Sequence, residues 1–76
     1  MFRKLCVFST YEAAGMVASL LRTNGFHPVD VEQSPHAFLA GADQFYFVQL
    51  PESEIETGRK FLIAEGYEKH LIDPRR

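Results

Sequence analysis

One pattern of residues occurs twice in this chain, in residues 2–26 and again in residues 45–67. Each copy begins with a short apolar run, continues with an acidic helix start and an amphipathic helix, and ends with glycine followed by an aromatic residue. An offset of 41 positions relates the matching residues: Gly25 and Gly66, Leu20-Leu21 and Phe61-Leu62, and Val7 and Val48. Two strand–helix halves predict a split βαβ sandwich. The repeat therefore indicates a fold, and it does not indicate a reaction.

The first half begins with a strand expected over residues 2–8. Strict alternation directs Leu5 and Val7 towards the core. The residues at the opposite positions, which are expected to face away from the core, are Phe2, Lys4, Cys6 and Phe8.

A helix follows this strand. Ser9 is the expected N-cap, because Glu12 stands three residues later as in a capping box. Ala13, Val17, Leu20, Leu21 and Asn24 follow at helical spacing and form a single stripe along the helix. Gly25 suits the left-handed residue just past a helix end, and Phe26 then packs back on Leu21, as in a Schellman motif.

Three more strands are expected. Residues 27–32 form an edge strand, because Pro28 has no N–H to donate to a neighbouring strand. Residues 44–50 are rich in aromatic side chains and form a third strand that ends at Pro51. Residues 70–72 are the candidate for a short fourth strand, whose presence the sequence leaves open.

The second helix begins in the acidic residues 52–56, where the helix dipole favours negative charge. Gly66 ends it, and Tyr67 folds back on the helix. The whole pattern predicts one domain over residues 1–72, followed by a polar tail at 73–76.

The predicted fold class is α+β, a ferredoxin-like βαββα(β) sandwich. Its antiparallel sheet has the first and third strands at the centre and both helices on one face. The other face of the sheet is left bare. The predicted core consists of Leu5, Val7, Val17, Leu20, Leu21, Val29, Val31, Val48, Leu50, Ile55 and Leu62.

Charge and apolar patterning limit the classes of partner. The formal net charge is −2 and the isoelectric point is near 5.8, whereas dedicated nucleic-acid binders carry basic patches. The apolar runs are too short to span a membrane or to form a signal peptide. Cys6 is the only cysteine, so no intramolecular disulfide can form, and a cytoplasmic location is expected.

No residue pattern in the chain predicts a reaction, a metal site or a cofactor. Cys6 has no partner base at strand or helix spacing and is expected to be an inert small apolar residue. The spacing of His27, His36 and His70 fits no metal-ligand motif. The glutamates at the two helix starts are explained by the helix dipole. The chain is therefore expected not to be an enzyme.

The bare sheet face is the expected interface. Cys6, Phe8, Phe45 and Phe47 form its predicted apolar patch, and the charged residues around this patch are Lys4, Asp30 and Glu32. Exposed apolar patches of this kind mark interaction sites. A homodimer is expected, or else a complex with another protein. Edge-strand charges are also a common protection against aggregation, which is the simpler explanation for Asp30 and Glu32.

The loop over residues 33–43 is the second candidate site. It contains His36, Phe38 and Leu39, and its centre is apolar. These apolar residues either tuck over the sheet edge or contact a partner or small ligand, since loops on rigid scaffolds carry binding.

Several of these segments resemble a known family. The matching residues are Glu12-Ala13, Leu20-Leu21, Gly25-Phe26 and Val48-Gln49-Leu50-Pro51. In these places, across residues 2–66, the chain is similar to the small bacterial domains classed as prokaryotic signal-transducing proteins. That family has no established activity, and its name implies a distant likeness to the ferredoxin-like PII nitrogen-regulatory proteins. The short loop over 33–43 lacks the tyrosine and the basic residues of true PII, so its nucleotide and 2-oxoglutarate binding is not implied here.

Two functions of different classes follow from these observations. The first is a non-enzymatic regulatory or protein-interaction module, which acts through the bare sheet face and the 33–43 loop. The alternative is a small-molecule sensor that binds a metabolite at a subunit interface, near the turn at Ser9, Thr10 and Tyr11. That turn lacks the glycine that amino-acid-binding ferredoxin-like domains favour.

Overall fold

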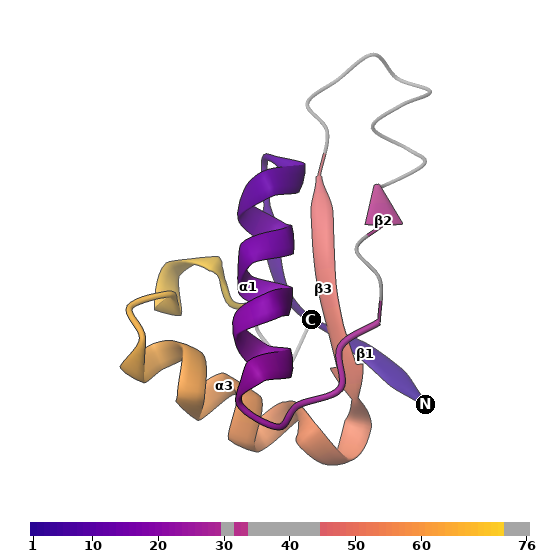
Figure 1. Ribbon diagram of the computed structural model, residues 1–76, viewed down its shortest axis with the longest axis vertical. Coiled ribbons are helices and arrows are strands. Elements are labelled where there is room, and N and C mark those ends of the chain that lie inside the picture. The colour runs from indigo at the N-terminus through magenta and orange to yellow at the C-terminus, as the bar shows by residue number, and fades with distance from the viewer. Residues whose placement is uncertain (30–31, 34–44, 73–76) are drawn as a thin grey trace.

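The chain forms an antiparallel sheet in which the strands from its two halves lie side by side (Figure 1). The computed structural model describes residues 1–29, 32–33 and 45–72, with the backbone alone for residues 32–33. Strand β1 spans Phe2–Phe8, β2 spans Glu32–Gln33, and β3 spans Tyr46–Pro51. The strand order is β1-β3-β2, and both pairings of β3 are antiparallel.

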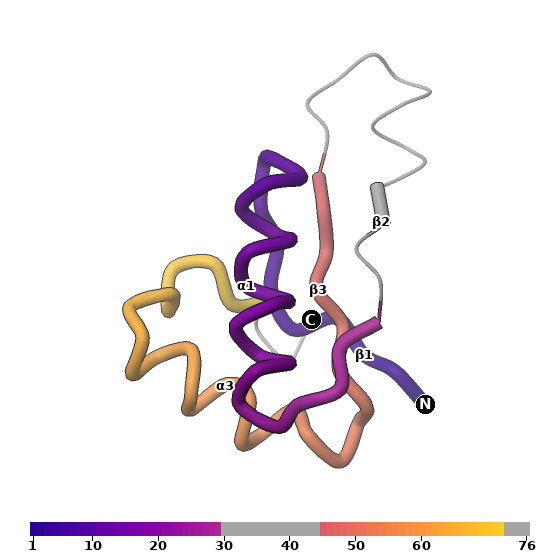
Figure 2. Tube along the Cα trace, in the orientation of Figure 1, coloured from indigo at the N-terminus to yellow at the C-terminus, as the bar shows by residue number. Residues whose placement is uncertain are grey.

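In the part of the chain that the structure describes, two α-helices pack on this sheet. Helix α1 spans Tyr11–Thr23 and lies along β1 and β3, as the ribbon and the Cα trace both show (Figures 1 and 2). Helix α3 spans Ile55–Ala64 and follows the 3-10 turn η1 at Glu52–Glu54. A second 3-10 turn, η2, spans Glu68–His70. The architecture is α+β, with an antiparallel sheet and two helices, as the sequence predicts.

Both α-helices end in the same way, which confirms the repeat seen in the sequence. Gly25 and Gly66 have φ values of 91° and 92°, a conformation in which a Cβ atom is strained. The N–H of Phe26 donates to the carbonyl of Leu21 at 3.0 Å, and that of Tyr67 donates to the carbonyl of Leu62 at 2.9 Å. The glycine N–H groups complete each motif by donating to the carbonyls of Arg22 and Ile63. These are two Schellman motifs.

The N-cap of α1 is Thr10, so the prediction of a capping box at Ser9 is wrong. The Thr10 side-chain oxygen accepts a hydrogen bond from the Ala13 backbone N–H at 3.2 Å. A threonine hydroxyl satisfies a free helix N–H as well as serine does, and the helix therefore begins one residue later than expected. Glu12 still lies in the first turn, where its charge favours the helix dipole.

Strand β1 contains a register irregularity that changes which side chains reach the core. Lys4 pairs with Gln49, but the next paired residue of β1 is Cys6, which lies opposite Val48. Leu5 is therefore one extra residue in β1, as in a β-bulge. After the bulge, Val7 pairs with Phe47 and Phe8 pairs with Tyr46.

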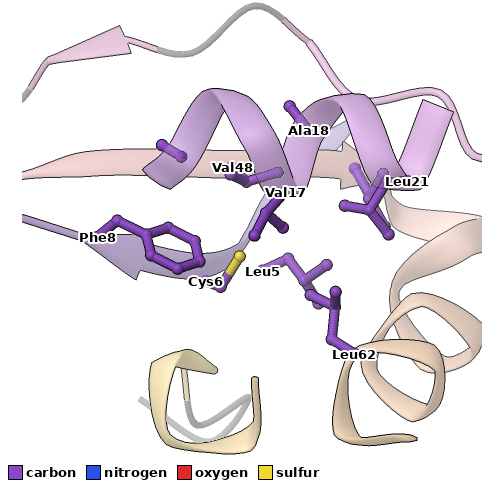
Figure 3. Close-up of a cluster of buried hydrophobic side chains, with 10 residues drawn as sticks. Leu5, Cys6, Phe8, Val17, Ala18, Leu21, Val48 and Leu62 are labelled. Carbon is purple, nitrogen blue, oxygen red and sulfur yellow. The ribbon is translucent and has the colours of Figure 1, made fainter. Parts of the chain in front are cut away.

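The core lies between the sheet and the two helices (Figure 3). Its buried side chains are Leu5, Cys6, Phe8, Ala14, Val17, Ala18, Leu21, Val48, Leu50 and Leu62. Helix α3 comes close to the sheet at Gly58, where a Cβ atom would clash with Leu50 Cδ1. The two halves also meet through the rings of Phe26 and Phe61, whose centroids lie 5.7 Å apart.

Several core predictions are confirmed and two are wrong. The confirmed residues are Leu5, Val17, Leu21, Val48, Leu50 and Leu62, and Ile55 packs at the margin. Val7 and Leu20 are only half-buried and lie outside the core cluster. The bulge turns Val7 to the other face, and α1 faces the sheet through the stripe Ala14, Val17, Ala18 and Leu21. Val29 is half-buried, and Val31 lies outside the described residues.

The strand boundaries differ from the prediction near β2. The strand expected over residues 27–32 is instead the short β2, and only the Val29 N–H reaches β3, at the Gln49 carbonyl. Pro28 has no N–H, and the His27 N–H donates to the Glu54 side chain, so neither residue extends the ladder. The predicted fourth strand is reduced to one bridge, between Leu71 and Cys6. The tail at 73–76 lies outside the described residues.

The orientation of α1 predicts unequal effects of two neighbouring substitutions. Leu21→Ala is expected to reduce the free energy of unfolding by about 2–5 kcal/mol, because Leu21 is fully buried and its truncation leaves a cavity. Leu20→Ala is the control, because it removes the same atoms from the same helix at a half-buried position. Its loss of unfolding free energy is expected to be clearly smaller. Urea unfolding followed by circular dichroism measures both. Equal losses would contradict the helix orientation.

Candidate interaction face

One face of the sheet is not used by the core, and we call it the open face. Its positions in β1, in β3 and just before β3 are Phe2, Lys4, Val7, Phe45, Phe47 and Gln49. Val7 lies directly opposite Phe47, and Lys4 lies opposite Gln49, so these pairs share a side of the sheet. The residues between them in the strands are the buried Cys6, Phe8, Val48 and Leu50. In the described part of the chain, both α-helices pack on that buried side.

The aromatic residues of the open face are accessible to different degrees. Phe45 is 44% exposed and Phe2 is 46% exposed, whereas Val7 and Phe47 are half-buried. Phe45 and Phe47 are two residues apart in an extended segment and therefore lie on the same side of it. Val7 lies beside them, on the neighbouring strand. These three side chains form the apolar centre of the open face, and Phe2 lies at the opposite end of β1.

Lys4 covers part of this apolar centre. Its ammonium nitrogen lies 4.2 Å from the centroid of the Phe47 ring, which is cation–π geometry. The aliphatic stem of a lysine can shield apolar surface while its ammonium stays in water. Lys4 forms no ion pair with any side chain that the structure describes. Among the described residues, the Phe47 ring is therefore the side chain that attracts this charge.

The structure assigns the predicted interface residues to two different sides of the sheet. Phe45 and Phe47 lie on the open face, as predicted. Cys6 and Phe8 do not, and this part of the prediction is wrong: they are 0% and 4% exposed and point into the core beside Val17 (Figure 3). The cause is the bulge at Leu5, which reverses the alternation for the rest of β1.

Val7 takes the place on the open face that the prediction gave to Phe8. It was missed because the bulge that turns it outward depends on pairing with a distant strand. No local residue signal, such as a glycine, marks the irregularity in this strand.

Phe8 closes one end of the core through an aromatic cluster. The His70 ring stacks on Phe8 with a centroid distance of 4.5 Å, and Tyr67 meets Phe8 edge to face at 6.3 Å. The adjacent Leu71 bridges to Cys6, and the Ile72 N–H donates to the Leu5 carbonyl at 3.0 Å. Arg59 of α3 donates to the Ile72 carbonyl at 2.7 Å. The segment after α3 is thus fixed against β1.

Cys6 is surrounded by apolar side chains, and burial raises the pKa of its thiol to about 12. Desolvation disfavours the thiolate, which is the form that attacks electrophiles or binds metals. Cys6 is consequently protonated at neutral pH and acts as a small core residue, which agrees with the structural role expected from the sequence.

His27 is held by Glu54 at the junction of the two halves. The His27 backbone N–H donates to Glu54 Oε1 at 2.8 Å, and its ring Nδ1 lies 2.6 Å from Oε2. The hydrogen bond with the ring, followed by that from the backbone, lowers the pKa of the Glu54 carboxyl. This pair fixes the turn after α1 to the turn before α3, and the sequence contains no spacing that would have predicted it.

The remaining candidate residues do not add a site to this picture. His36, Phe38 and Leu39 of the 33–43 loop lie outside the described residues, and so does Asp30. Within the described ranges, no group of three or more His, Cys, Asp or Glu side chains is placed to hold a metal ion. No helix in these ranges is long and apolar enough to cross a membrane.

Comparisons of this chain with protein-family models, curated proteins and solved structures find no match.

Burial of Cys6 predicts very slow thiol modification in the folded protein. At pH 8, the folded protein is expected to react with Ellman's reagent on the order of a hundredfold more slowly than the protein unfolded in concentrated guanidinium chloride. The reason is that burial both shields the thiol and depletes the reactive thiolate. A Cys6→Ala, Ser19→Cys variant carries its thiol at an exposed position of α1 and should react at once. Fast reaction of Cys6 in the folded wild type would place it outside the core.

The Glu54–His27 pair predicts a pH-dependent contribution to stability. Because the pKa of Glu54 is lower when folded, its contribution is complete above its unfolded pKa of about 4.3 and is lost as the pH falls through the folded pKa. Glu54→Gln should therefore lower Tm at pH 7, and the difference from wild type should shrink towards pH 3. Glu56→Gln removes a charge from the same helix start and is the control. A pH-independent difference at Glu54 would contradict the assignment.

Proposed function

We propose that this chain is a non-enzymatic regulatory or protein-interaction module that docks a partner protein on its open face. The observation that carries the proposal is the group Val7, Phe45 and Phe47, which lies on the side of the sheet away from both helices. Aromatic side chains are enriched at the centres of protein interfaces, where they bury a large area. Lys4 at the edge of this group supplies a charge that orients a partner.

Two observations support a binding role over a catalytic one. Cys6 is the only cysteine, and its thiol is buried with a pKa raised to about 12, which removes it as a nucleophile at neutral pH. Thr10, at the turn where a ligand was the alternative expectation, already uses its side-chain oxygen to cap α1. Of the described features, the open face is therefore the one that best supports a function, and that function is binding.

The finer fold that we propose is the ferredoxin-like sandwich. It is supported by the central position of β3, by its antiparallel pairing with β1 and β2, and by the bridge that brings Leu71 beside β1. We also propose membership of the small prokaryotic signal-transducing proteins, with a bacterial cytoplasmic setting. The family membership is supported by Gly25-Phe26, which forms a Schellman motif, and by Leu21 and Val48, which lie in the core. The bacterial cytoplasmic setting is what such membership implies.

Site-specific photocrosslinking tests the open face directly. The photoreactive residue p-benzoylphenylalanine replaces Phe45 in one variant and Ile63 in the other, and both are expressed in the native host. These positions are matched in exposure, at 44% and 43%, but Ile63 lies on α3 away from the open face. Irradiation is expected to give a discrete protein adduct from position 45 and none from position 63.

Adducts identified by mass spectrometry show which protein lies on the face, including another copy of this chain. The same adducts from both positions, or none from either, would contradict a docking role for the open face. Phe45→Lys should abolish any complex that the crosslink detects, whereas Ile63→Lys should leave it intact.

A further inference from the structure

The outer edge of β1 is open near the start of the strand. Because the strand order is β1-β3-β2, β1 has a neighbouring strand on one side only. On its other side, the backbone contacts among the described residues come from Leu71 and Ile72. These two residues reach Cys6 and Leu5 and extend no further along β1. The segment Phe2–Lys4 therefore has no ladder partner on that side within the described ranges, and all its residues are exposed.

The backbone groups of Phe2 and Lys4 point to this open edge. The N–H of Glu52, which directly follows β3, donates to the Met1 carbonyl at 2.8 Å. Alternate residues of a strand bond to the same neighbour in an antiparallel ladder, so Arg3 also bonds towards β3. The N–H and C=O groups of Phe2 and Lys4 then point outwards. Unpaired backbone groups at a sheet edge are a template for a further strand.

Two basic side chains flank this edge without covering it. Lys4 reaches across the open face towards β3, where its ammonium lies 4.2 Å from the Phe47 centroid. Arg3 is the next residue of the strand and lies on the opposite face, 3.8 Å from the Glu52 carboxylate. This pair is half exposed, and exposed ion pairs contribute little, so the Arg3 guanidinium is available to another acid. Both cations turn towards β3 and away from the outward backbone groups.

The charge at this edge determines which strand fits beside it. The β1 strand of a second copy would place the like charges of Arg3 and Lys4 together, which destabilises a strand pair. The tail at 73–76 contains a proline, which lacks an N–H, and two arginines, which repeat the sign of the edge. An extended segment with acidic side chains instead brings the opposite charge to both cations.

We infer that the outer edge of β1 at Phe2–Lys4 binds an extended acidic segment of a partner protein by antiparallel strand addition. Successive side chains of the added strand lie on opposite faces of the sheet. Two adjacent acidic residues then pair with Lys4 on the open face and with Arg3 on the helix side. The next residue of the segment lies opposite the exposed Phe2 and is expected to be apolar. The recognised sequence is therefore acidic, acidic, apolar, at a site separate from the apolar centre of the open face.

Synthetic peptides test this inference with the full chain. The probe is a fluorescein-labelled peptide of sequence Ser-Thr-Glu-Glu-Val-Thr-Ser, and its matched control carries lysine in place of both glutamates. Fluorescence anisotropy is expected to show that the wild type binds the glutamate peptide at least about tenfold more tightly than the lysine peptide. Lys4→Glu should weaken binding of the glutamate peptide by roughly tenfold and strengthen that of the lysine peptide. Lys60→Glu on α3 is the control variant and should leave both affinities unchanged.

Backbone methylation separates strand addition from simple charge attraction. Two further glutamate peptides are N-methylated at alternate residues, one on each of the two sets, so that their charge is the same. Only one set of N–H groups faces β1 in an added strand, so one methylated peptide should lose binding and the other should keep it. Equal binding of these two peptides would overturn the strand addition.

Two other outcomes would also overturn it: equal binding of the glutamate and lysine peptides, or no binding of either by the wild type at millimolar peptide. Far-UV circular dichroism confirms that each variant is folded before its affinity is interpreted. Phe45→Lys alters the open face at the other end of the sheet and should leave peptide binding unchanged. The edge site and the proposed docking face can therefore fail independently, because the crosslink from position 45 does not depend on the peptide.

Discussion

The bulge at Leu5 determines both the core and the open face. An extra residue in a strand moves every later side chain to the opposite face. In β1 this shift carries Phe8 into the core and Val7 out of it, while Leu5 and Cys6 are both buried. Phenylalanine has a larger apolar surface than valine, so the exchange removes more apolar area from water beneath the helices. The half-buried Val7 beside Phe47 is the other consequence of the same irregularity.

The parts of the fold set by local chemistry could be predicted from the sequence. Gly25 and Gly66 are followed by aromatic residues, and only a glycine adopts positive φ without strain, so both helix ends were specified within a few residues. Phe26 and Tyr67 then fold back over the helices and pack against the core. The α+β class and the central position of β3 followed from the same local signals combined with the order of the elements.

The parts set by contacts between distant segments could not be predicted in this way. Leu20 and Leu21 are equally apolar, and which of them is buried depends on which side of α1 faces the sheet. The side that faces the sheet carries Ala14, Val17, Ala18 and Leu21, which leaves Leu20 half-buried. Of the four predicted interface residues, Phe45 and Phe47 lie on the open face, because β3 alternates regularly. Cys6 and Phe8 lie in the core, because β1 does not.

A domain of 76 residues has few residues with which to cover both faces of its sheet. Among the described residues, both α-helices pack on one side, and the other side is covered there by side chains of the strands themselves. Lys4 is one of them: its stem shields Phe47, and its ammonium keeps contact with water. Small domains without disulfides gain much of their stability from a further layer of protein. In the docking that we propose, Lys4 would also discriminate between partners, because burying its charge without a large cost requires an acidic group at that point.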